Sequence, residues 1–207
     1  IDWAEYGFIE IKEENFDKEI KNIFKDESIV GLNVTIPYKE KILNYIEETN
    51  SIFFSSFLPI NCVTFNRYPG AGTYDSFKQE AENTDGFGFE KAVLHNFYGE
   101  ENCCAIVLGY GGASKAIIHQ LTLSSSFKSI FVFNRTFDKI KNIKKIFGDQ
   151  TKQNDSTVDP LELNKLPSYI NRANLVVNTT PINMLGKKAR WDISSKCYGF
   201  DVVYRPW

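Results

Sequence analysis

The order of apolar and polar residues over the first hundred positions predicts short strands separated by amphipathic helices. Three strands are expected, at residues 6–11, 29–34 and 62–65. A helix capped by Asn15 is expected between the first two strands, because apolar residues recur there on one helical face. Those apolar residues are Phe16, Ile20, Ile23 and Phe24.

Two further helices are expected before residue 98. One begins at Pro37, since proline has a fixed φ and no N–H to lose at the first helical position. Its buried stripe consists of Ile42, Leu43 and Ile46. The other covers residues 85–97, where large apolar residues recur every four positions. The polar residues 68–82 contain proline and glycine and are expected to form a loop.

From residue 98 onward, short apolar strands alternate with helices. Strands are expected at residues 103–108, 129–133, 175–177 and 199–203. Helices are expected directly after Gly109, around residues 140–147 and over residues 161–172. This alternation indicates parallel βαβ units. We therefore predict an α/β protein with two domains, at residues 1–97 and 98–207.

The composition is that of a soluble globular protein, since 43% of the 207 residues are hydrophobic and 24% are charged. The net charge of −2 argues against a nucleic-acid partner, because binding to a phosphate backbone needs a basic surface. No apolar run approaches the ~18–20 residues that cross a bilayer, and no signal peptide is visible. A membrane is therefore not expected as a partner, and a homodimer stays open.

The four cysteines point to a compartment rather than to a site. Cys62, Cys103, Cys104 and Cys197 have no CxxC spacing, and the chain has only two histidines to accompany them. This pattern disfavours a zinc site and a disulfide framework, so no metal is expected. Unpatterned thiols fit a reducing cytoplasm, which is the expected location.

A glycine-rich loop follows the strand at residues 103–108 and precedes a helix, which is the context in which such a loop binds a dinucleotide. Gly109 permits a tight turn, and Gly111 lets the backbone approach a pyrophosphate. Ser114 is small enough for close packing of helix and strand, and the helix N-terminus stabilises the anion. A bulky side chain at Tyr110 would crowd the ligand. A turn that serves packing alone is the alternative.

The next strand leads to Asn134, where NAD-selective sites place a carboxylate. Arg135 follows, and an arginine can bind a 2′-phosphate through paired charge-assisted hydrogen bonds. Lys139 lies about one helical turn further on and adds positive charge. The sequence therefore favours NADP, with solvated surface cations as the alternative interpretation.

A second group of polar residues lies in the first half. Asn33 and Thr35 face the same side of their strand, and Lys39 follows in the expected first turn of a helix. A cation is unfavourable at that end of a helix dipole, which indicates either a function or plain exposure. Asp85 stands at an expected N-cap, where capping alone would explain it.

Six short motifs occur in order along the chain. They occupy residues 31–39, 83–88, 109–114, 134–136, 178–181 and 201–204. Their sequences are GLNVTIPYK, NTDGFG, GYGGAS, NRT, NTTP and DVVY. Taken together, these motifs resemble the shikimate dehydrogenase family.

The resemblance implies an N-terminal α/β substrate-binding domain and a Rossmann-like parallel-sheet domain that binds NADP. A cleft between the two domains would hold the reactants. It also implies the NADPH-dependent reduction of 3-dehydroshikimate to shikimate, a step in the biosynthesis of chorismate and the aromatic amino acids.

The resemblance further assigns roles to individual residues. Lys39 resembles the catalytic lysine of the family, and Asp85 resembles its carboxylate partner. The candidates for binding the substrate are Asn33, Thr35, Asn61 and Tyr204. The pyrophosphate loop is matched by Gly109, Gly111, Gly112, Ala113 and Ser114. The adenosine 2′-phosphate pocket is matched by Asn134, Arg135, Thr136 and Lys139. Thr179 and Thr180 lie in the segment that approaches the cofactor after the fourth strand of that domain.

Two segments of the family pattern are not found. No Ser-rich substrate-binding turn precedes residue 31, and no final helix with a substrate-binding glutamine follows residue 204. We therefore expect the first domain to be incomplete at its N-terminal side and the second at its C-terminal side. Two alternative functions stay open, namely a quinate/shikimate dehydrogenase that also uses NAD and a non-catalytic sensor of NADP or a shikimate-like ligand.

Overall fold

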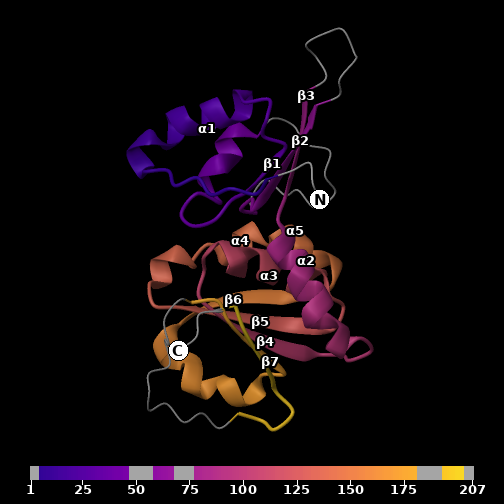
Figure 1. Cartoon of the computed structure of the whole chain (residues 1–207). Helices are drawn as coiled ribbons and strands as arrows, with labels where there is room; N and C mark the ends of the chain where they lie inside the picture. Colours follow the sequence, from indigo (N-terminus) through magenta and orange to yellow (C-terminus); the bar gives the residue numbers. More distant parts are fainter. Residues whose placement is uncertain (1–4, 47–57, 68–76, 181–192, 203–207) are drawn as a thin grey trace.

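Two β-sheets organise the chain, one in each lobe of the computed structural model (Figure 1). The structure describes residues 5–46, 58–67, 77–180 and 193–202. The upper lobe in the figure contains the strands β1 to β3, and the lower lobe contains β4 to β8. Within the described residues, the helices are too short and too polar for any of them to cross a membrane.

The first lobe is an antiparallel sheet in the order β1-β2-β3, packed against one helix. Its elements are η1 (Glu13–Asn15), α1 (Phe16–Lys25), β1 (Gly31–Asn33), η2 (Lys41–Tyr45), β2 (Cys62–Arg67) and β3 (Phe77–Glu82). The helical face expected from the sequence is present, because Phe16, Ile20 and Ile23 are all buried. Phe16 and Ile20 join Ile42 and Val63 in one core cluster.

Several sequence-based expectations for this lobe are wrong. Residues 6–11 form no strand, and Tyr6 and Phe8 are highly exposed. A strand is stable only when a neighbour pairs with its backbone, and no described strand pairs with this segment. Asn15 precedes α1 without a side-chain capping bond. The local sequence favoured a strand and a cap, but no described strand pairs with residues 6–11 and the Asn15 side chain makes no capping bond.

The segment around Pro37 is a turn rather than the start of a helix. The backbone N–H of Tyr38 donates to the carbonyl of Thr35, and the first helical residues after it form the short 3-10 helix η2. Lys39 therefore lies in a turn, so the helix-dipole argument for its position does not apply.

Residues 77–82, expected to be part of a loop, form the strand β3. They pair with β2 over its whole length, from Cys62 opposite Glu82 to Arg67 opposite Phe77. Gln79 and Ala81 are buried on one face, although only one of them is apolar. A polar strand of this kind gives little periodic signal, and its pairing with β2 decides its conformation.

The second lobe is a five-stranded parallel sheet in the order β6-β5-β4-β7-β8, which confirms the Rossmann-like α/β class. Its strands are β4 (Cys103–Leu108), β5 (Phe127–Asn134), β6 (Thr157–Glu162), β7 (Leu175–Asn178) and β8 (Tyr198–Asp201). All six residues of β4 are buried, as a continuously apolar central strand requires. The long helix α3 (Gly112–Leu123) follows it directly.

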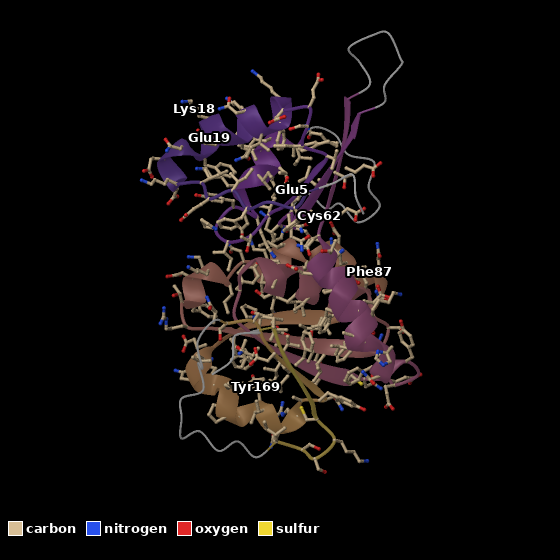
Figure 2. The ribbon with its side chains drawn as sticks, viewed as in Figure 1. Glu5, Lys18, Glu19, Cys62, Phe87 and Tyr169 are labelled. Atoms are coloured by element: carbon tan, nitrogen blue, oxygen red, sulfur yellow. The ribbon has the colours of Figure 1, made fainter. Side chains whose placement is uncertain are left out.

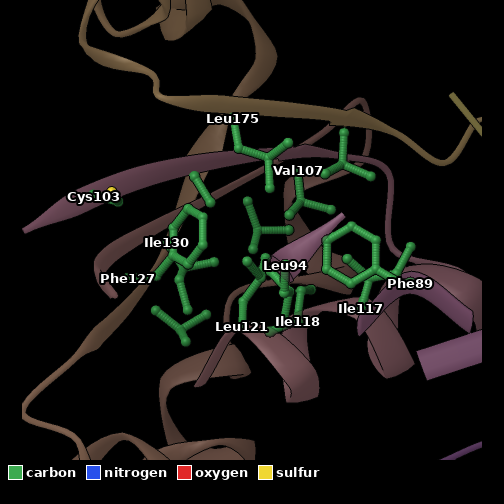
Figure 3. Packing of buried hydrophobic residues seen from close by; sticks show 14 of the residues in the cluster. Phe89, Leu94, Cys103, Val107, Ile117, Ile118, Leu121, Phe127, Ile130 and Leu175 are labelled. Carbon is green, nitrogen blue, oxygen red and sulfur yellow. The ribbon is translucent and has the colours of Figure 1, made fainter. Parts of the chain in front are cut away.

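Both faces of this sheet are covered. One face packs on α3 through Val107, Ile118, Leu121 and Ile130 (Figure 3). The other face packs on η5 (Leu163–Ser168) and η6 (Ile170–Arg172) through Ile106 and Phe133. The remaining short elements are η4 (Phe137–Lys139), α4 (Ile143–Ile146) and α5 (Gly148–Gln153).

The helix expected over residues 161–172 is wrong at its start. Residues 157–162 are the edge strand β6, and two 3-10 helices follow. Pro160 lies inside β6, which an edge position tolerates because one side of an edge strand needs no hydrogen bond. Asp159 and Pro160 interrupt the apolar pattern of this strand, so the sequence did not predict it.

Helix α2 (Thr84–Ala92) and η3 (Leu94–Phe97) pack on the second lobe. Phe89, Val93 and Leu94 belong to the same core cluster as Val107 (Figure 3). A Cβ on Gly86 would lie 3.1 Å from a side-chain carbon of Gln120, so α2 and α3 approach closely. The domain boundary near residue 97 stays a prediction, and the packing groups α2 with the residues that follow it.

Candidate functional site

A short ion pair between the lobes joins Lys39 and Asp85. The ammonium nitrogen Nζ of Lys39, from the turn after β1, lies 2.7 Å from Oδ2 of Asp85 in the first turn of α2. The two side chains are 19% and 27% exposed, so the pair is partly shielded from water and still reachable. Asn61 donates from Nδ2 to the other carboxylate oxygen, Oδ1, at 2.8 Å. Asp85 is therefore held on both oxygens.

Asn83, rather than Asp85, caps helix α2. Its Oδ1 accepts hydrogen bonds from the backbone N–H groups of Asp85 at 3.0 Å and Gly86 at 3.3 Å. Its Nδ2 donates to the carbonyl of Pro59, and the Asn83 side chain is buried. The expectation that Asp85 is the N-cap is therefore wrong. Because Asn83 satisfies the helix end, the Asp85 carboxylate is available to Lys39.

Asn61 connects the first sheet to α2. Its Oδ1 accepts from the backbone N–H of Thr84 at 2.8 Å, and its Nδ2 also donates to Thr84 Oγ1 at 3.0 Å. Its backbone N–H donates to the carbonyl of Glu82, and its own carbonyl accepts from Val34. These bonds fix the position of Asn61 on both its main chain and its side chain.

The glycine-rich loop lies against the lysine. A Cβ on Gly112 would be 3.4 Å from Cδ of Lys39 and 3.4 Å from Cγ of Pro59. The aliphatic part of Lys39 therefore packs on the start of α3. In Figure 2, side chains of the two lobes meet at this level, near Cys62 at the start of β2 and above the helix that carries Phe87. The fold thus brings a polar cluster of the first half to the loop of the second.

The loop itself has the geometry of an anion-binding turn. Gly109 has φ +104°, and a Cβ there would lie 2.6 Å from Thr179 Oγ1 and 2.8 Å from Thr180 Cγ2. A Cβ on Gly111 would meet nothing within 4 Å. Ser114 is fully buried and donates from Oγ to the carbonyl of Gly111 at 2.9 Å. The backbone is thus closely packed at Gly109 and open at Gly111, where a ligand can approach.

Tyr110 does not project from the loop tip. Its ring packs against the core cluster of the second lobe, and its hydroxyl is buried with no hydrogen-bond partner among the described residues. Burial raises the pKa of Tyr110, and the nearby Glu40 carboxylate raises it further. The expectation that Tyr110 crowds a ligand is therefore not supported by its orientation.

Thr179 and Thr180 stand at the carboxyl end of β7, beside Gly109. Thr179 donates from Oγ1 to the carbonyl of Leu108 at 2.7 Å. Thr180 donates from Oγ1 to Oδ1 of Asn178 at 2.7 Å, and Asn178 Nδ2 lies 3.2 Å from each carboxylate oxygen of Asp201. The sequence analysis did not identify Asn178 and Asp201 as residues that hold Thr180 in place beside Gly109. Their place in two of the six motifs was the available signal.

The basic residues expected to select the cofactor stand at the carboxyl end of β5. Asn134 donates from Nδ2 to the carbonyl of Thr136 at 3.0 Å, which closes a turn. Arg135, Thr136 and Lys139 are exposed. Since Phe133 of β5 is in register with Leu108 of β4, this turn and the glycine loop leave the same edge of the sheet. The residues present fit a phosphorylated dinucleotide.

Some of the substrate-binding candidates lie near Lys39 in the chain. Asn33 and Thr35 are exposed residues on the chain that leads to Lys39, and Asn33 Nδ2 donates to the hydroxyl of Tyr6 at 3.0 Å. Tyr204 lies outside the described residues. Within the described ranges, no group of three or more His, Cys, Asp or Glu side chains is arranged to hold a metal ion.

Two family models match this chain. Residues 3–52 match the shikimate dehydrogenase substrate binding domain, and residues 92–188 match the model described as shikimate / quinate 5-dehydrogenase. The chain is 30% identical to "Shikimate dehydrogenase (NADP(+))" of Dictyoglomus thermophilum, covering 98% of this chain and 68% of the relative. It is 31% identical to the protein of that name from Thermotoga maritima, covering 96% and 67%.

Solved structures give the same picture of the fold. Shikimate dehydrogenase from Aquifex aeolicus superposes with a TM-score of 0.66 at 25% identity, covering 94% of this chain and 66% of that one. Shikimate 5-dehydrogenase from Listeria monocytogenes, solved with shikimate and NAD, gives a TM-score of 0.68 at 22% identity, covering 95% and 67%. The chain spans about two thirds of the length of the relatives it matches.

Proposed function

The chain belongs to the shikimate dehydrogenase family, and on that premise we propose that it catalyses the reversible, NADP-dependent reduction of 3-dehydroshikimate to shikimate. The observation that carries the proposal is the Lys39–Asp85 pair, whose Nζ and Oδ2 lie 2.7 Å apart against the start of α3. The reaction belongs to the biosynthesis of chorismate and the aromatic amino acids, and we propose a cytoplasmic location.

The proposed cofactor site combines three segments that follow strands β4, β5 and β7 at the carboxyl edge of the second sheet. The open backbone at Gly111 and the N-terminus of α3 would take the pyrophosphate, and Arg135 and Lys139 would take the 2′-phosphate. Thr179 would line the path toward the lysine. NADPH, when bound, supplies the hydride for the reduction.

The proposed role of Lys39 is to donate a proton from Nζ to the ketone oxygen, on which negative charge develops during reduction. In the reverse direction, the same nitrogen accepts the proton of the hydroxyl group. Asp85 orients Nζ through the bond at Oδ2, and Asn61 holds Oδ1, so that the carboxylate keeps a single orientation. A fixed orientation matters because misplacement by about 1 Å can cost a factor of about 100 in rate.

The remaining candidates would read the hydroxyl groups of the substrate. Asn33 and Thr35 are exposed and offer an amide and a hydroxyl near the lysine turn, and Tyr204 stays a candidate from the sequence. Asn61 is proposed for the same task. Its amide already bonds to Thr84 and Asp85, so we expect it to act on the substrate and on the orientation of Asp85 together.

A second candidate substrate is quinate, because the model matched by residues 92–188 is described for both shikimate and quinate dehydrogenases. Quinate differs from shikimate in lacking the ring double bond and carrying one more hydroxyl group. Discrimination between them would therefore depend on the polar side chains around the ring.

The test is a steady-state assay of the purified protein with four pairs of substrates, namely shikimate or quinate with NADP or NAD. We expect kcat/KM to be highest for shikimate with NADP. A preference for quinate or for NAD would replace this assignment by the broader dehydrogenase. Binding of NADP without turnover of either substrate would favour the sensor.

A further inference from the structure

A second ion pair connects the lysine turn to the glycine loop. Glu40 directly follows Lys39, and Lys115 lies at the end of the first turn of α3. Nζ of Lys115 is 2.7 Å from Oε1 of Glu40, and the two residues are 75 positions apart. The Lys115 side chain is 20% exposed and the Glu40 side chain 57%, so one partner is mostly shielded from solvent.

Lys115 occupies a place that its own helix disfavours. The dipole of α3 is positive at this end, so a cation there is destabilised. Two contacts offset the cost, because Glu40 supplies a carboxylate and the ring centroid of Tyr110 lies 5.5 Å from Nζ. Tyr110 is in turn held by the core of the second lobe. Lys115 therefore links Tyr110 of the glycine loop to Glu40, the residue next to Lys39.

The segment around Lys39 has three anchors. The carbonyl of Lys39 accepts from the backbone N–H of Ile60 at 2.8 Å, Cδ of Lys39 packs at Gly112, and Glu40 is bound by Lys115. A lysine side chain has four rotatable methylene groups, so the place of Nζ depends on where the backbone holds it. Besides the Lys39–Asp85 pair itself, the Glu40–Lys115 pair is a second ion pair that ties this turn to the second lobe.

We propose that Glu40 and Lys115 are positioning residues, which hold the turn carrying Lys39 at the start of α3 and so set the place of Nζ relative to the proposed cofactor site. This inference rests on the proposed function. It assigns no contact with substrate or cofactor to either residue. A direct role of Lys115 as a phosphate ligand is the competing interpretation, because Lys115 is near a helix N-terminus.

The first experiment measures kinetics for Glu40→Gln, Lys115→Gln and the double variant. We expect kcat for shikimate oxidation to fall about three- to tenfold in each single variant, with the Kd for NADP changed less than about twofold. The double variant should lose no more than either single variant, because both changes remove one interaction. Lys115→Arg keeps the charge and should retain most of the turnover.

A matched control is Lys152→Gln. Lys152 also pairs with a carboxylate, Asp149, at 3.4 Å, but both side chains are largely exposed and the pair lies within α5. We expect no change in kcat. An additive loss in the double variant would overturn the proposal. So would a rise of more than about tenfold in the Kd for NADP with kcat unchanged, which would make Lys115 a phosphate ligand.

The second experiment does not depend on activity. Hydrogen–deuterium exchange of the backbone amides at residues 36–41 should become about two- to fivefold faster in Glu40→Gln and in Lys115→Gln, and unchanged in Lys152→Gln. Unchanged exchange in the first two variants would overturn the inference. If the unmodified protein turned over neither shikimate nor quinate, the proposed function would fail, and the exchange would still decide whether the pair anchors the turn.

Discussion

Lys39 donates a hydrogen bond to Asp85 across 46 positions of sequence, and the Nζ–Oδ2 distance is 2.7 Å. The lysine comes from a turn next to the first sheet, whereas the aspartate comes from a helix packed on the second sheet. The contact therefore depends on how the two lobes meet. It is supported on the aspartate side by Asn61 and on the lysine side by the packing at Gly112.

Replacement of the lysine tests the proposed chemistry. In Lys39→Ala we expect kcat for shikimate oxidation to fall by about 10²–10⁴, since this removes the proton-transferring group. The Kd for NADP should change little, because Lys39 packs at Gly112 through Cδ and its proposed role is in proton transfer. Lys91→Ala, which removes an exposed lysine of α2, is the control for loss of charge. Retention of most of the turnover in Lys39→Ala would rule out Lys39 as the proton donor.

The cap of α2 should affect both stability and turnover. Asn83→Ala removes the two capping bonds and leaves the carbonyl of Pro59 without its donor. We expect a loss of about 1–3 kcal/mol in the free energy of unfolding, measured by urea denaturation, and a lower kcat because Asp85 loses its support.

Asn15→Ala is the matched control for the cap. Asn15 precedes α1 but makes no side-chain capping bond, so its removal should leave the unfolding free energy nearly unchanged. Equal losses in the two variants would contradict the assignment of Asn83 as a functional cap.

Gly109 and Gly111 should respond differently to the same change. Gly109→Ala forces a Cβ to 2.6 Å from Thr179 Oγ1 at a positive φ, so we expect a loss of about 1–3 kcal/mol in stability. Gly111→Ala adds a Cβ in open space and should leave the melting temperature close to that of the unmodified protein. Its effect should instead be a weaker Kd for NADP, because the methyl group stands where the pyrophosphate is proposed to approach.

Selectivity for NADP is expected to depend on Arg135. Arg135→Ala should lower kcat/KM with NADP by about 10- to 100-fold, as expected for loss of a charge-assisted hydrogen bond, and should leave kcat/KM with NAD nearly unchanged. Arg172→Ala is the control, since Arg172 is the last residue of η6 and lies over the Tyr169 ring, on the sheet face opposite α3. An equal loss with both cofactors would contradict a role in binding the 2′-phosphate.

Alkaline pH should destabilise the fold through Cys104. Burial raises the pKa of the Cys104 thiol from 9.0 to about 11, which means that the folded state holds this proton more tightly than the unfolded state. The stabilising contribution is complete below about pH 9 and is lost as the pH rises through about 11. Urea denaturation across this range should show a falling midpoint. The fall should be smaller in Cys104→Ala, and an equal fall would assign it to other groups.

Much of the second lobe could be predicted from the sequence. The strand at residues 103–108 coincides with β4, because a central parallel strand is buried on both sides and must be apolar throughout. The edge strand β6 could not be predicted, since its Asp159 and Pro160 are tolerated only at an edge. The apolar pattern thus predicted the buried central strand β4. It missed the edge strand β6, whose conformation depends on its pairing with β5.

The resemblance of six motifs to a family pointed to the residues proposed for the chemistry. The sequence by itself determined the glycine loop and the apolar strands before and after it. These are local properties, since they depend on backbone freedom, side-chain volume and periodic burial. Only the tertiary structure decided that Asn83 rather than Asp85 caps α2, that Tyr110 packs inward, and that Lys115 reaches Glu40. Such contacts join segments far apart in the chain, and their geometry follows from the packing of the two lobes rather than from any local pattern.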